Sequence, residues 1–121
     1  MDGTMVETPA GYLQITPAVT FTRRLAGLLG ARSLGRDEAL LLYPCAGIHT
    51  LGMRFAIDVL FLDAGGLPLQ QQSCVLPWRL VTAPPQTVMT LELAAGRLDR
   101  NYCDGLKWSG LAAIARGLTR A

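Results

Sequence analysis

Proline and glycine divide this chain into short apolar runs. Its 121 residues include 7 prolines and 13 glycines, scattered between segments rich in leucine, isoleucine and valine. Both residue types end regular elements and form turns, so their spacing predicts many short strands rather than a helical bundle. The length suits a single domain over residues 1–121, with 1–10 as a loose leader and 111–121 as a peripheral tail. That tail is either a small docking helix or a frayed end.

The segment 57–62, IDVLFL, is the strongest predicted strand because it is apolar on both faces except at Asp58. Glycines in the turn 63–66 should reverse it into a hairpin with 67–75. One helix is predicted at 21–29, where leucines recur at helical spacing. Further short strands are expected at 12–15, 39–43, 48–55 and 88–93. Short turns favour antiparallel neighbours. The predicted fold is therefore mainly β (α+β): a small antiparallel sandwich or partly closed barrel with one covering helix near the N-terminus.

The charge pattern argues against nucleic acid as a partner. The 11 basic and 9 acidic residues give a net charge of +2, whereas nucleic-acid binders carry a dense basic stripe with aromatic partners. No apolar run reaches the roughly 18 residues needed to span a bilayer. The N-terminus lacks the basic start and apolar core of a secretion signal. We therefore expect a cytoplasmic protein without a membrane partner.

The segment 44–63 places the single histidine, a cysteine, an arginine and Asp58 against large apolar residues. A carboxylate in such a strand must be paired, hydrogen-bonded or protonated. Asp58 therefore either fixes the start of its strand by accepting amide hydrogens, or belongs to a binding or catalytic site with Arg54 and His49. Both interpretations remain open from the sequence.

Cys45 and His49 raise the question of a metal or nucleophile site. On a strand, positions four apart lie about 13 Å from each other, too far to share a metal ion. We therefore assign no metal and no cofactor. Cys45, Cys74 and Cys103 are widely spaced and are expected to be free thiols. Cys45, His49 and Asp58 remain candidates for a thiol enzyme, but no oxyanion loop or helix N-terminus is evident beside Cys45. No catalytic residue is assigned, and the sequence leans away from an enzyme.

Two polar or amphipathic positions elsewhere also have two interpretations. Trp78 either covers the core or is exposed on its loop as an anchor of the kind found in recognition patches. Glu92 lies opposite the apolar side of an alternating strand. It is therefore either an ordinary solvent-facing charge or a partner for Arg54 or Arg79.

We expect a small binding or accessory module with a polar pocket. The candidate ligand-binding residues are His49, Arg54, Asp58 and Trp78, in a concave region where Arg54 could face a small anionic ligand. The partner is an unidentified small ligand or protein. The alternatives are a thiol- or metal-dependent enzyme that uses Cys45, His49 and Asp58, and a purely structural or partner-binding protein.

Three motifs resemble a bacterial and archaeal family, the "domain of unknown function 192". They are the arginine–GLLG segment 23–30, the block 39–66 and the sequence VMTLELAAG at 88–96. Ala56 departs from the family pattern, in which a proline is usual. The resemblance implies a small β-rich domain and supplies no assured reaction, cofactor or catalytic residue.

Overall fold

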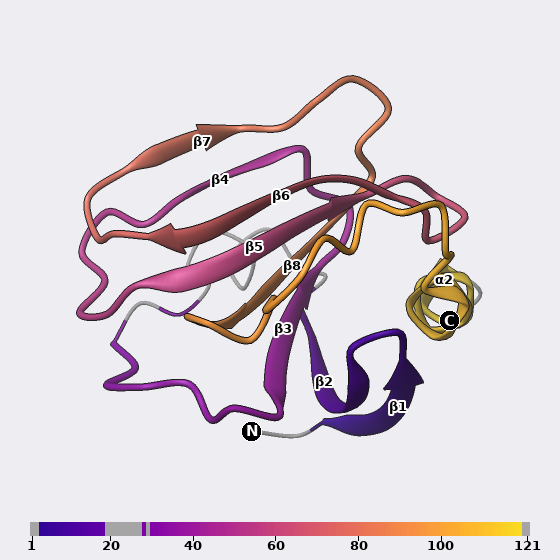
Figure 1. Cartoon of the computed structure of the whole chain (residues 1–121), viewed down its shortest axis with the longest axis horizontal. Helices are drawn as coiled ribbons and strands as arrows, with labels where there is room; N and C mark the ends of the chain where they lie inside the picture. Colours follow the sequence, from indigo (N-terminus) through magenta and orange to yellow (C-terminus); the bar gives the residue numbers. More distant parts are fainter. Residues whose placement is uncertain (1–2, 19–27, 29, 120–121) are drawn as a thin grey trace.

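The computed structural model describes residues 3–18, 28 and 30–119. These residues form two sheets and one helix (Figure 1). The elements are β1 Thr4–Thr8, β2 Gly11–Ala18, β3 Glu38–Leu42, β4 Gly47–His49, β5 Ile57–Leu62, β6 Pro68–Val75, β7 Leu80–Thr82, β8 Met89–Ala94 and α2 Ser109–Thr119. The prediction of a mainly β fold is confirmed.

The larger sheet has six strands in the order β1-β2-β3-β8-β5-β6. Its neighbours pair antiparallel as expected, except that β2 and β3 are parallel, with Ile15 beside Ala39. The expectation of antiparallel neighbours rested on short turns. Residues 19–37 between these two strands are instead numerous enough for the crossover of about a dozen residues that parallel pairing requires.

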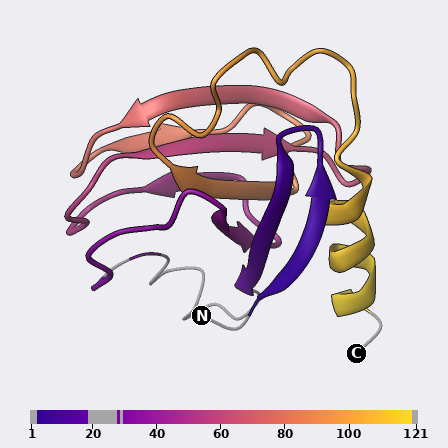
Figure 2. The ribbon, with the colours of Figure 1, turned by 60° about the horizontal axis from the view of Figure 1, so that its bottom comes forward.

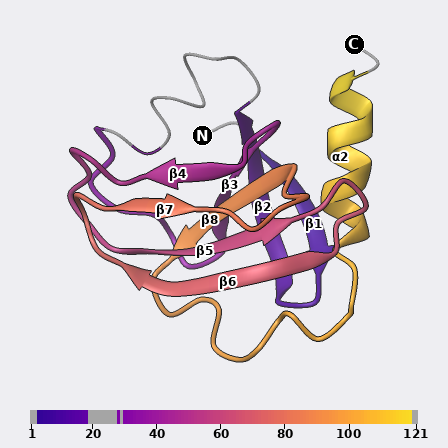
Figure 3. The same ribbon diagram turned by 90° about the horizontal axis from the view of Figure 1, so that it is seen from above.

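The smaller sheet consists of β4 and β7, which pair antiparallel and lie over one face of the larger sheet (Figure 3). Its inward side chains, Ile48 and Val81, pack against a core that includes Val59 and Phe61 of β5. The two sheets do not close around this core. Of the two predicted architectures the layered one is observed, and the partly closed barrel is wrong.

The other face of the larger sheet is covered by the C-terminal part of the chain, with α2 beside β1 (Figure 2). Trp108 and Leu111 are buried there against Leu60 and Leu93. Gly66 allows this close approach, because a Cβ at that position would lie 2.5 Å from the carbonyl oxygen of Trp108. Residues 111–119 therefore belong to a docked helix rather than a frayed end.

The N-terminal expectations need correction. Residues 4–8 form the edge strand β1 rather than a loose leader. The helix predicted at 21–29 falls on residues that, except for Leu28, lie outside the described part of the chain. The helix that the structure does describe is C-terminal, and it is not long and apolar enough to cross a membrane.

Candidate functional site

Asp58 is fully buried, and backbone amides surround its carboxylate. Oδ1 accepts a hydrogen bond from the Cys74 amide at 2.8 Å. Oδ2 accepts from the Gly96 amide at 3.0 Å and from the Leu98 amide at 2.9 Å. Cys74 lies in a bulge of β6, where Ser73 and Cys74 are both opposite the single residue Asp58 of β5. Asp58 therefore ties this bulge and the turn after β8 to β5, which is the first of the two roles that the sequence left open.

The structure does not bring Asp58 together with Cys45 and His49. Side chains alternate along β5, so Asp58 shares the face of Leu60 and Leu62, which pack on the α2 side of the larger sheet. His49 lies in β4, over the opposite face. The larger sheet therefore separates the carboxylate from the imidazole, and the proposed orienting group of a Cys–His–Asp set is missing.

Cys45 and His49 have separate surroundings. The Cys45 thiol donates to the carbonyl oxygen of Gly47 at 3.0 Å. His49 is half-buried beside Leu80 of β7, and its buried Nδ1 atom has no hydrogen-bond partner among the described residues. Among residues 3–18, 28 and 30–119, no group of three or more His, Cys, Asp or Glu side chains could hold a metal ion. Nothing in this geometry supports the thiol- or metal-dependent enzyme.

Thr50 fastens the loop that carries Trp78. Its hydroxyl donates to the carbonyl oxygen of Leu76 at 2.7 Å and accepts from the amide of Arg79 at 2.9 Å. Its own amide donates to the Arg79 carbonyl oxygen at 2.8 Å, and its carbonyl oxygen accepts from the Trp78 amide at 2.9 Å. Thr50 is fully buried, so these four bonds fix the loop against the end of β4.

This loop displays large apolar side chains instead of covering the core. In residues 76–79, Trp78 is 65% exposed and Leu76 is 49% exposed. Leu80 at the start of β7 is 77% exposed, and Leu51, which follows Thr50 in the loop after β4, is 40% exposed. We call Leu51, Leu76, Trp78 and Leu80 the apolar patch. Arg54 and Arg79 are exposed on the same two loops. Of the two interpretations of Trp78, exposure on its loop is the observed one.

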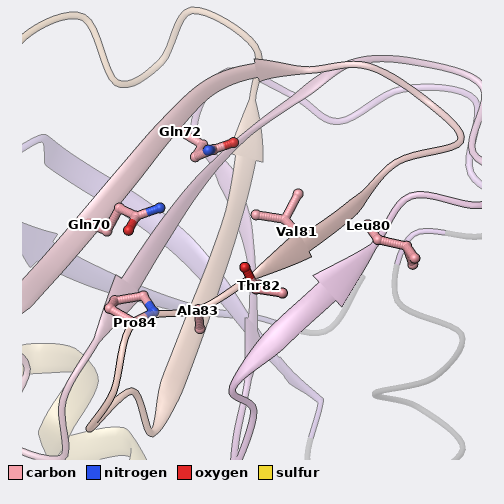
Figure 4. Close-up of a pocket in the computed structure, with 7 residues that line it drawn as sticks. All are labelled: Gln70, Gln72, Leu80, Val81, Thr82, Ala83 and Pro84. Carbon is pink, nitrogen blue, oxygen red and sulfur yellow. The ribbon is translucent and has the colours of Figure 1, made fainter.

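Three hollows lined by described residues border β7. One of about 320 Å³ lies between β6 and β7 and is shown in Figure 4; it is lined by Gln70, Gln72, Leu80, Val81, Thr82, Ala83 and Pro84. The second, of about 270 Å³, shares Gln72, Leu80 and Val81 with the first and continues to Leu76 and Arg79. Together they form what we call the β6–β7 trough. The third, of about 370 Å³, lies on the β4 side and includes His49.

Glu92 was missed as a buried acid. It lies in β8 between Leu40 of β3 and Val59 of β5 and is 2% exposed. Within the part of the chain that the structure describes, one of its carboxylate oxygens has no hydrogen-bond partner. Burial raises its pKa to about 7. The prediction of a solvent-facing charge, or of a partner for Arg54 or Arg79, is wrong. The alternating sequence of β8 is typical of a strand with one face in solvent. β8 is instead a central strand, and the smaller sheet covers the face that carries Glu92.

Replacing Thr50 by valine is expected to release the Trp78 loop. The change removes the hydroxyl of a fully buried side chain, which donates to one backbone group and accepts from another. This loss should lower the free energy of unfolding by about 2 kcal/mol. Amide hydrogen exchange should speed up at Trp78 and Arg79 and stay unchanged in β8. A Thr82→Val variant, at an exposed position of β7, is the control. Equal exchange rates in the Thr50 variant and the wild type would contradict the assigned role.

The fold and these surroundings define a small two-sheet β domain that presents apolar side chains beside a strand edge. Residues 5–104 match the family DUF192, described as "Uncharacterized ACR", and the chain belongs to that family. The resemblance noted in the sequence is thereby confirmed. No functionally curated protein matches the chain.

Two solved bacterial structures share the fold. A protein of unknown function from Novosphingobium aromaticivorans is 19% identical with a TM-score of 0.70, over 79% of this chain and 74% of that one. A protein from Sinorhizobium meliloti, described as "a putative transcription regulator", is also 19% identical with a TM-score of 0.70, over 83% of this chain and 88% of that one. At this identity the likeness concerns the fold alone.

Proposed function

We propose that this chain is a non-catalytic binding module that recognises another protein through the apolar patch and the adjoining face of β4 and β7. The observation that carries the proposal is Trp78, 65% exposed on a loop that Thr50 holds in place. Large apolar side chains gathered on a surface usually mark an interaction site. Because Thr50 holds the backbone of this loop, less entropy is lost there when a partner binds, which makes the tryptophan an effective anchor.

The charges around the patch favour a partner that carries carboxylates. Between residues 39 and 91 the acidic residues are Asp58 and Asp63. Asp58 is buried among amides, and Asp63 accepts hydrogen bonds from its own turn. Arg54 and Arg79 thus form a positive border without acidic neighbours in this stretch. The predicted counter-charge role of Arg54 is kept here, for an acidic protein segment, and His49 lies at the β4 side of the same surface.

The test is selection of a displayed random-peptide library on the immobilised protein. We expect enriched peptides to lose at least about tenfold in affinity for a Trp78→Ala variant, because an anchor of this kind is worth more than about 1.4 kcal/mol. Tyr12→Ala is the matched control, since Tyr12 is an aromatic residue 61% exposed on β2. Peptides that bind both variants equally, or a selection that enriches nothing over an unrelated protein, would refute the proposed function.

A further inference from the structure

β6 and β7 follow each other in the chain but belong to different sheets. They run in opposite directions, as the arrows in Figures 1 and 3 show, and are joined by residues 76–79. In an ordinary hairpin such strands would pair. Here β6 is the last strand of the larger sheet, and β7 pairs only with β4 among the described strands. Each therefore has one edge whose backbone groups face no strand of the described chain.

The β6–β7 trough lies along these two edges. Gln70 and Gln72 stand on the face of β6 that looks toward the smaller sheet, since they pair with Phe61 and Val59 of the inter-sheet core. Figure 4 shows both amides directed into the space beside Val81 and Thr82. Gln71 points the other way and bonds to Arg100 and Tyr102. Within the described part of the chain, the Gln70 and Gln72 side chains make no hydrogen bond.

We propose that an extended segment of a partner protein adds to the outer edge of β7 as a third strand of the smaller sheet, running antiparallel to β7. This inference rests on the proposed function and names its partner class. The added strand would lie over β6, where the amides of Gln70 and Gln72 form the floor. Strand addition of this kind takes its affinity from backbone hydrogen bonds and its specificity from pockets for alternate side chains.

The chemistry of the trough sets the composition of that segment. Because it runs antiparallel to β7, its C-terminal end lies beside the beginning of β7, where Arg79 lines the trough. A glutamate or aspartate at this end meets the guanidinium. The exposed side chains of Leu80 and Leu76 favour an apolar side chain at the position of the added segment that faces away from the larger sheet. A second copy of this chain that added its own β6 or β7 is a poorer occupant, because residues 64–91 contain no acidic residue to face Arg79.

The probe is a capped hexapeptide of alternating valine and threonine that ends in glutamate, titrated by NMR. We expect a dissociation constant on the order of 1 mM, given the few residues it can pair. Methylating one backbone nitrogen of the peptide at a time should weaken binding at least about tenfold at every second residue. At the residues between, binding should weaken by less than about twofold, because only alternate amides face the edge of β7. Replacing the glutamate by glutamine, or Arg79 by glutamine, should each weaken binding about threefold, without further loss when combined.

The outcomes separate the two proposals. Uniform tolerance of N-methylation, or absence of binding at several times the expected constant, overturns strand addition. In that case Trp78-dependent library peptides would still uphold the proposed function. Methylation-sensitive binding that ignores Trp78→Ala upholds strand addition and removes the apolar patch from recognition. If the protein is a dimer in solution and its amide shifts do not change when the peptide is added, a second copy occupies the edge of β7. That result overturns the inference.

Discussion

Replacing Asp58 by asparagine is expected to lower the free energy of unfolding by about 4 kcal/mol. Both carboxylate oxygens are occupied, by amides of Cys74, Gly96 and Leu98, and the residue is fully buried. Asparagine keeps one acceptor oxygen but turns an NH₂ group toward amide donors. At least one of these three amides then loses its partner and faces another donor, beside a fully buried side chain. Urea denaturation measures the change directly.

Asp63→Asn is the matched control for this prediction. The amides of Gly65 and Leu67 both bond to Oδ1 of Asp63, so an asparagine oxygen can accept both. Asparagine is also well suited to such turns, and the expected loss is below about 1 kcal/mol. If Asp58→Asn cost no more than Asp63→Asn, the amide bonds of Asp58 would not be what fixes the β6 bulge.

Replacing Glu92 by glutamine is expected to stabilise the protein by about 3 kcal/mol at pH 8, because between pH 4.5 and about 7 the wild type loses about 1.36 kcal/mol of stability per pH unit. The pKa of Glu92 rises from 4.5 to about 7 because burial disfavours the charged form. Between these values the folded chain holds a proton that the unfolded chain has released. Wild-type stability should therefore fall as the pH rises from about 4.5 to about 7, and then level off.

Unfolding curves at a series of pH values test this linkage. Well below pH 4.5 both the folded and the unfolded wild type carry a neutral Glu92, so the glutamine variant should gain little there. Glu7→Gln is the control, since Glu7 is an exposed strand glutamate in β1. A wild-type stability that rises across this pH range, or a Glu92→Gln variant destabilised equally at every pH, would show that the carboxyl is not held neutral by burial.

The sequence predicted much of the fold because its apolar runs are short and clearly bounded. The strands at 57–62 and 39–43 appear as β5 and β3, shifted by at most a residue at either end, and the turn at 63–66 joins β5 to β6 as predicted. Strand order and the parallel pair of β2 and β3 could not be predicted. Both depend on contacts between segments that are far apart in the sequence. The periodicity within one segment does not show which other segment it contacts.

The candidate site was predicted less well, for a related reason. A strand that is apolar on both faces gives no sign of which face meets which layer, so Asp58 could not be placed on the side away from His49. Glu92 looked exposed because alternation describes its own strand and not the sheet above it. The hydrogen bonds of Thr50 to Leu76 and Arg79 join residues that are 26 and 29 positions apart in the sequence. No local sequence pattern could therefore predict how this loop is held.

The most direct test of the proposed binding surface is an NMR map of backbone amide shifts during addition of the glutamate-ended hexapeptide. We expect the largest changes at residues 70–72, 76 and 78–83, with smaller ones across β4 and none in α2. Changes centred instead on Gly96, Leu98 and the α2 side of the larger sheet would place binding at the face that carries Asp58, and would contradict this account.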